Sequence, residues 1–206
     1  MCYNVSEGVS KMAVHTNPER SLITQTRILH AATKLVKTQG WETTKIKDIC
    51  AEAGVSIGAF YHHFASKQEL MNRAFLLFDE TLGNHLPKAA ASPLEAVKDV
   101  LLVQTAFVVS EAGPIITEYY KNILMDQNRS AVNPERAYYK RVLSCVENAR
   151  DFFRSDLELD YIAELLIKFV RGCLIDWCLH DCGYDVVERT GKELDFLFSG
   201  LKQQST

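Results

Sequence analysis

The stretch from residue 50 to residue 64 limits the fold of this chain more than any other, because it contains a tight turn between two short helices. The first helix is indicated by four residues at the spacing of one helical face: Ile46, Ile49, Cys50 and Ala53. Gly54 follows, and glycine readily adopts the left-handed conformation that ends a helix. Ser56 can then accept a backbone N–H as the cap of the next helix. The sequence therefore predicts a helix, a turn and a second short helix.

The second helix is expected to have one buried side and one outward side. Phe60 and Phe64 lie one turn apart and form the buried side. The remaining positions are left for an outside partner: Ile57, Gly58, Ala59, Tyr61 and His62. A short helix of this kind behind a glycine turn is typical of a helix-turn-helix protein that reads DNA.

The flanking residues complete a familiar pattern. Between residues 27 and 70 the sequence contains Ile28-Leu29-His30-Ala31-Ala32, Gly40, Thr44, Asp48-Ile49, Ala53-Gly54-Val55-Ser56, Phe60-Tyr61, Phe64 and Ser66-Lys67. As a set these residues resemble the DNA-binding domain of TetR/AcrR-type transcriptional regulators. The resemblance covers roughly the first third of the chain, and the remainder is similar to that family in length and helical character.

The resemblance implies a specific DNA-binding surface. It assigns DNA contacts to Thr44, Ser56, Ile57, Gly58, Ala59, Tyr61, His62 and Lys67. Thr44 and Lys67 would hold the DNA backbone from the N-termini of two neighbouring helices, where anions are favoured. Family members often carry Thr where this chain has Ala59, so a hydroxyl is missing from the surface here. The resemblance also implies a homodimer that binds a pseudo-palindromic operator and releases this DNA when a small-molecule effector binds. Most members of such a family are repressors.

The charge distribution agrees with a DNA partner for the N-terminal part. The whole chain of 206 residues has a formal net charge of −3. Residues 18–73 contain eight Lys and Arg against five Asp and Glu, whereas residues 74–206 contain 14 against 20. The N-terminal part therefore carries the sign that suits phosphate.

Composition and periodicity predict an all-α protein in three segments. Hydrophobic residues make up 47% of the chain, but no apolar run reaches the roughly 18 residues of a membrane helix. We expect a flexible segment at 1–16 without a signal-peptide pattern, a helix-turn-helix DNA-binding domain with a connecting helix at 17–83, and a helical ligand-binding and dimerisation domain at 84–206. A cytoplasmic location follows, and there the six cysteines would stay reduced.

Helix signals place the elements along the chain. Asn17-Pro18 begins the first helix and Gly40 ends it, and Thr44 is expected to cap the second. Ser66 and Ser92 open helices as the first residues of capping boxes. The later helices are expected at about 66–82, 92–108, 115–127, 133–153, 156–182 and 185–199.

Aromatic and polar residues in the second domain suggest a cavity for a small apolar or flat ligand. The candidate lining residues are Gln104, Tyr119, Tyr120, Met125, Tyr138, Phe169, Cys173 and Trp177. Arg171 and Asp176 could orient a ligand or face solvent. For any one of these residues, ordinary core packing is the competing interpretation.

The last two helices carry enough apolar surface for a dimer. The candidate interface residues are Leu166, Val170, Leu174, Leu194, Leu197 and Phe198, with Gly172 permitting close helix approach. The competing interpretation is that both faces are buried within one subunit.

Two other functional classes are open at this point. Cys178 and Cys182 lie one turn apart, so their thiolates could share a soft metal or sense oxidants, although a free Cys is usually a small buried hydrophobe. His180 falls on a different side of a regular helix, so a complete metal site would need a further ligand from Cys173 or a second subunit. A helical interaction protein without DNA binding is the second alternative. The signatures of hydrolases and phosphate-binding loops are missing from the sequence, so we expect no enzyme and no cofactor.

Overall fold

A computed structural model describes residues 17–71, 73, 79, 82, 85–87, 89–112, 116–124 and 130–203. Across these ranges the chain is all-α, as predicted, apart from one antiparallel bridge between Phe153 and Lys202. No helix in this part of the protein combines the length and the apolar character needed to cross a bilayer. The expected N-terminal segment 1–16 and most of the connecting helix lie outside the described residues.

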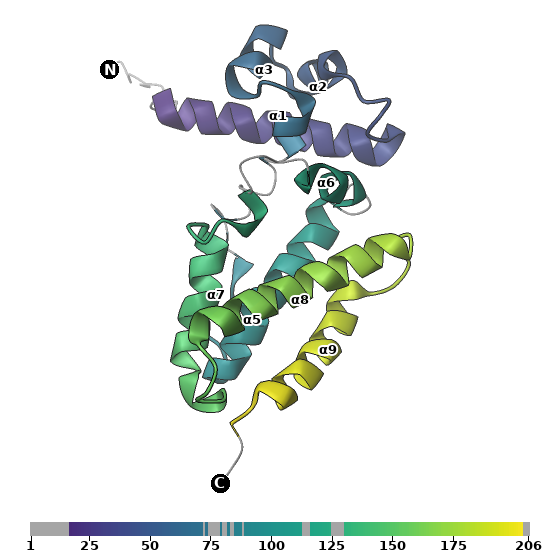
Figure 1. Cartoon of the computed structure of the whole chain (residues 1–206). Helices are drawn as coiled ribbons and strands as arrows, with labels where there is room; N and C mark the ends of the chain where they lie inside the picture. Colours follow the sequence, from purple (N-terminus) through teal and green to yellow (C-terminus); the bar gives the residue numbers. More distant parts are fainter. Residues whose placement is uncertain are drawn as a thin grey trace, which may run out of the picture.

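Three helices form the N-terminal unit at the top of Figure 1: α1 (Asn17–Gln39), α2 (Ile46–Ala53) and α3 (Ile57–His63). Gly40 follows α1 with φ +85°, and Gly54 follows α2 with φ +64°, so both glycines adopt the left-handed conformation that ends a helix. The Ser56 Oγ accepts the N–H of Ala59 at 3.0 Å and caps α3. The helix, turn and helix predicted from the sequence are confirmed.

A small hydrophobic core holds these three helices together. Ile28 from α1, Ile49 from α2 and Phe60 from α3 are completely buried, and Phe64 is nearly so. Leu70, just after Ser66, closes the same core. The N–H of Glu69 donates to the Ser66 Oγ at 3.0 Å, as expected for a capping box.

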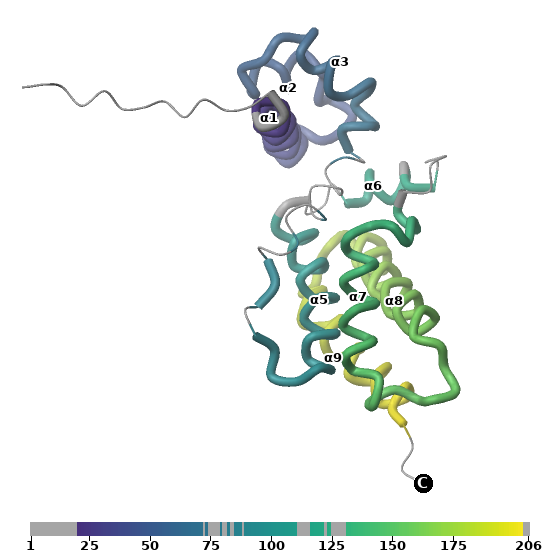
Figure 2. The backbone as a smooth tube through the Cα atoms, turned by 90° about the vertical axis from the view of Figure 1, so that its left-hand side faces the viewer, coloured from purple at the N-terminus to yellow at the C-terminus, as the bar shows by residue number. Residues whose placement is uncertain are grey.

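The C-terminal unit is a helical bundle. It contains α5 (Pro93–Phe107), the π-helical turn η1 (Val108–Ala112), α6 (Ile116–Ile123), the short 3₁₀ turns η3 (Ser130–Val132) and η4 (Arg150–Phe152), α7 (Ala137–Asn148), α8 (Leu159–Leu179) and α9 (Val186–Leu201). α5 packs against α7, α8 and α9, and α7 packs against α8. Figure 2 shows α6 between this bundle and α1.

Several helix boundaries differ from the sequence prediction for local reasons. α2 begins after Lys45, because the Thr44 hydroxyl donates to the Gly40 carbonyl at 2.8 Å and does not cap the helix. Asn133 accepts the N–H of Glu135 in a turn, so α7 begins three residues after Pro134. Asp156 binds Arg154, and α8 begins later at Leu159.

The apolar face expected to form a dimer lies inside the subunit. Leu166, Val170 and Leu194 are completely buried, and Leu174 and Phe198 are nearly so. They face α5 and α7 in the main hydrophobic core, and Leu197 packs at its edge. Five of the six expected interface residues therefore belong to the subunit core, which corrects their assignment to the dimer interface, and Leu197 is partly exposed.

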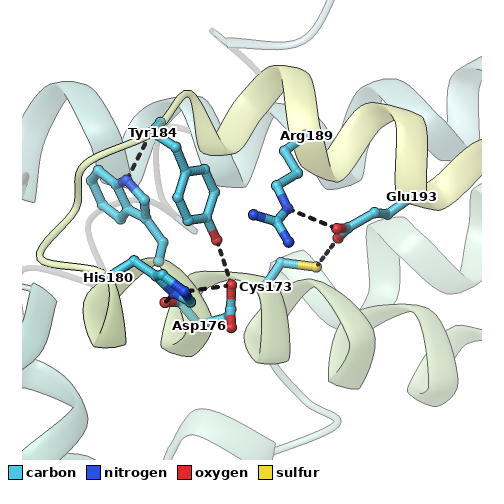
Figure 3. Close-up of polar contacts among 7 residues, drawn as sticks. Cys173, Asp176, His180, Tyr184, Arg189 and Glu193 are labelled. Atoms are coloured by element: carbon cyan, nitrogen blue, oxygen red, sulfur yellow. Dashed lines mark hydrogen bonds and ion pairs between the residues drawn. The ribbon is translucent and has the colours of Figure 1, made fainter.

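Polar contacts connect the end of α8 to the start of α9 (Figure 3). The Tyr184 hydroxyl donates to the Asp176 carboxylate at 2.8 Å, and the Trp177 indole N–H donates to the Tyr184 carbonyl at 2.9 Å. Further along, the Cys173 thiol donates to Glu193, which also accepts from Arg189. α8 ends at Leu179, earlier than predicted, because Asp181 and Cys182 both take positive φ in the turn.

Candidate DNA-binding surface and effector cavity

α3 presents one face to its own core and the opposite face to solvent. Phe60 is completely buried, whereas the side chains of Ile57 and Tyr61 are 52% and 54% exposed. Gly58 and His62 are exposed beside them. A Cβ added at Gly58 would meet no atom closer than 3.8 Å, so this side of the helix is open to a large partner.

Lys67 and Thr44 lie beside this surface but have partners within the protein. The Lys67 Nζ donates to the Trp41 carbonyl at 2.6 Å and to the Thr44 carbonyl at 3.0 Å. It also lies 4.1 Å from the centre of the Trp41 ring, and burial lowers its pKa. The Thr44 side chain is buried. Both residues therefore position the loop between α1 and α2, and an ammonium has a third N–H left for a phosphate.

The bundle contains a partly open cavity of about 200 Å³. Its wall is built by α5, α6, α7, α8 and the turn before α7, and it includes Gln104, Tyr119, Tyr120, Tyr138, Tyr139 and Arg171. The Tyr119 and Tyr120 rings meet edge to face with centroids 5.4 Å apart. The structure thus brings together four of the residues that the sequence suggested for ligand binding, namely Gln104, Tyr119, Tyr120 and Tyr138.

Three other candidates lie elsewhere, and one lies outside the described residues. Cys173 and Trp177 point toward α9 and the turn before it, and Phe169 packs against the main core outside the cavity wall. The cavity is lined instead by the α8 face that carries Ile167, Arg171 and Leu174. Met125 falls in a segment that the structure does not describe.

Sequence reasoning named Arg171 but missed the other charged groups of the cavity wall. Arg136 makes a two-pronged ion pair with Asp79, with both N–O distances 2.8 Å and both side chains about one-tenth exposed. Burial raises the pKa of Tyr120 and of Tyr138, while the positive charge of Arg171 acts in the opposite direction on both. The tyrosine hydroxyls therefore stay neutral hydrogen-bond donors beside a permanent cation.

Cys178 and Cys182, near the end of α8, contact each other through a hydrogen bond between their thiols. Within the described ranges, no group of three or more His, Cys, Asp or Glu side chains is placed to hold a metal ion. Burial raises the pKa of the Cys178 thiol, and it raises that of Cys182 to about 11. A raised pKa lowers the thiolate fraction that metal binding and oxidation require.

Comparison with known proteins identifies the N-terminal unit. Residues 28–74 match a family model described as bacterial regulatory proteins, tetR family. The matched range begins in α1 and contains α2, α3 and their exposed face. Residues 28–74 therefore form a DNA-binding domain of the TetR type. This agrees with the resemblance carried by the sequence motifs between residues 27 and 70.

Similarity to known proteins extends beyond the first domain. The transcriptional repressor KstR2 of Mycobacterium tuberculosis is 26% identical over 158 residues, which cover 70% of this chain and 74% of the relative. NalD, the secondary repressor of the MexAB-OprM multidrug efflux pump in Pseudomonas aeruginosa, has a TM-score of 0.60 at 22% identity and covers 91% of this chain and 100% of its own. FadR of Bacillus subtilis, solved with stearoyl-CoA, has a TM-score of 0.61 at 17% identity. The match covers 85% of this chain and 98% of the FadR chain. The two structural likenesses show that the fold shared with these proteins includes the C-terminal bundle.

Proposed function

We propose that this protein is a transcriptional repressor that releases its operator when a small molecule enters the cavity of the C-terminal bundle. The exposed face of α3 in a TetR-family domain carries this proposal. A repressor among the relatives and an acyl-CoA ligand in a structural neighbour support it. Such a protein acts where the chromosome is, in the cytoplasm.

The DNA-binding surface consists of Ile57, Gly58, Tyr61 and His62 on α3. A recognition helix reads base edges when it enters the major groove, and small residues let its backbone come close. Ala59 is half-buried and lies at the edge of this surface. Ser56 caps the helix, and Thr44 and Lys67 support its neighbours.

The homodimer interface that we propose is the outer face of α8 and α9. Leu179 and Phe196 are 78% and 83% exposed, and Ile175 is 40% exposed. Gly172 is exposed on the same side of α8, one turn before Ile175 and Asp176. A large exposed apolar patch marks an interaction site. A two-fold axis through it would present two copies of α3 to half-sites about 34–36 Å apart.

α6 and Arg136 couple the cavity to the DNA-binding unit in this proposal. Tyr119 and Tyr120 of α6 line the cavity, whereas the neighbouring Glu118 lines a groove against the loop that carries Trp41. Both views of the backbone place α6 between α1 and the bundle. A ligand that binds better to one position of α6 would shift the equilibrium between two orientations of the DNA-binding unit.

DNA binding is tested by selecting duplexes from a randomised library and measuring fluorescence anisotropy. Tyr61→Ala should weaken binding to the selected duplex about tenfold, which corresponds to about 1.4 kcal/mol. Tyr161→Ala is the matched control, because its side chain is 53% exposed at the start of α8. Failure to enrich any duplex, or equal effects of the two substitutions, would contradict the proposed function.

A further inference from the structure

One positive charge on the cavity wall has no carboxylate partner in the described part of the chain. Arg171 donates to the Ala131 carbonyl at 3.0 Å, and this is a neutral acceptor. Arg136 is neutralised by Asp79. Glu164 and Lys168 lie one turn apart at the exposed rim and balance each other. The interior of the cavity therefore carries the net charge of Arg171.

The surroundings of Arg171 are suited to an acid with a flat apolar body. A guanidinium has five N–H donors in a planar fork that matches a carboxylate with two parallel hydrogen bonds. The neighbouring Tyr120 and Tyr138 are neutral donors, and aromatic rings pack edge to face against other rings. A cation that is partly removed from water is stabilised most by an anion.

The size of the cavity restricts the ligand further. Its volume of about 200 Å³ is below the roughly 300–1,000 Å³ of sites for drug-sized molecules. One or two fused rings with a carboxylate fill such a space. A long-chain acyl-CoA, like that bound to FadR, exceeds the cavity formed by the described residues.

We infer that the effector is a small aromatic carboxylate whose acidic group binds Arg171 while its rings lie among the tyrosines of α6 and α7. This inference rests on the proposed function, because it names the ligand class of the same cavity. It predicts that a charged acid binds more tightly than a neutral molecule of the same shape.

The test compares 2-naphthoate with 2-naphthamide by isothermal titration calorimetry at pH 7.5. The two probes have the same ring system and nearly the same shape, and they differ in charge. We expect the wild-type protein to bind the acid at least tenfold more tightly than the amide. Arg171→Gln should reduce this ratio to about two or less, because the remaining wall is neutral.

Two further variants separate a local effect from misfolding. Arg171→Lys keeps the charge but loses the fork, so we expect it to retain part of the preference for the acid. Arg154→Gln is the control, because Arg154 is an exposed arginine paired with Asp156 away from the cavity. It should keep the full wild-type ratio, and the melting temperatures of all variants report whether the fold is intact.

Three outcomes would overturn the inference: equal or tighter binding of the amide, a wild-type ratio in folded Arg171→Gln, or no heat from either probe at millimolar concentration. Operator release is followed separately by anisotropy. Binding of the acid without release of DNA would contradict the proposed switch and leave the ligand class intact. Release by neutral aromatics alone would contradict the ligand class and leave the switch intact.

Discussion

Gly54 sits at the sharpest point of the helix-turn-helix, and replacing it with alanine should destabilise the protein in a predictable way. Its φ of +64° belongs to the left-handed region, where a residue with a Cβ loses about 1–2 kcal/mol. The added Cβ would also lie 2.9 Å from an Nη atom of Arg27. That atom donates to the Ala53 carbonyl at 2.6 Å, so the guanidinium cannot move away without lengthening this bond.

The backbone cost and the strained Arg27 hydrogen bond together cause a moderate loss of stability. A hydrogen bond from a charged group contributes about 1.5–3 kcal/mol, and a flexible Arg27 would lose part of it. Together with the backbone cost, we expect Gly54→Ala to lower the free energy of unfolding by about 2–3 kcal/mol. For a chain of this length that corresponds to a fall of roughly 4–12 °C in melting temperature.

Gly58→Ala provides the matched control on the next helix. The new Cβ there would be 3.8 Å from the Ser56 Oγ, an ordinary contact, and φ is not positive. Alanine is favoured over glycine inside a helix by about 1 kcal/mol, so this variant should be as stable as the wild type or slightly more stable. Circular dichroism during heating and during urea unfolding measures the stability of both variants. Equal stability of the two variants would refute the argument from backbone conformation.

Other predictions concern the ion pair, the subunit interface and a buried thiol. Asp79→Asn leaves Arg136 without its counter-charge and should cost about 3–5 kcal/mol in urea unfolding; an unchanged midpoint would show that the pair contributes no stability. The double variant Leu179→Glu and Phe196→Glu should sediment as a folded monomer at micromolar concentration, because both side chains are exposed in the subunit; a dimer would exclude this face. Burial and Glu193 raise the pKa of Cys173 from 9.0 to about 11, so the folded state holds a proton that the unfolded state loses, and stability should fall from pH 9 toward pH 11. The melting temperature of Cys173→Ala should fall less over this range, and equal slopes would contradict the assignment.

Local chemistry made much of the fold predictable. Gly54, Ser56 and Ser92 each act through atoms within three residues along the chain, and each behaves as predicted. Asn133 and Asp156 have the same capping chemistry, but Asn133 uses it in the turn before α7 and Asp156 pairs with the Arg154 guanidinium. A side chain that can cap a helix can also stabilise a turn, and the sequence does not separate the two uses.

The faces of α8 and α9 show why the interface was not predictable from the sequence. Phe196 and Phe198 are two residues apart, and the first is exposed whereas the second is buried. Both are phenylalanines, and α9 carries apolar residues on two sides, so the sequence does not distinguish them. Which side meets α5 depends on the packing of the whole bundle. Arg136 was missed as a cavity residue for a related reason, because it pairs with a residue 57 positions away.

The contact between Lys67 and Trp41 has a practical consequence for following the protein in solution. The chain contains two tryptophans, and Trp177 lies near the turn between α8 and α9. Trp41 lies where the loop after α1 meets the larger hydrophobic core, with an ammonium 4.1 Å from its ring centre. In a Trp177→Phe protein, Trp41 would be the sole intrinsic fluorophore of the indole type. Its emission would then report movement between the DNA-binding unit and the bundle in stopped-flow mixing, without an attached dye.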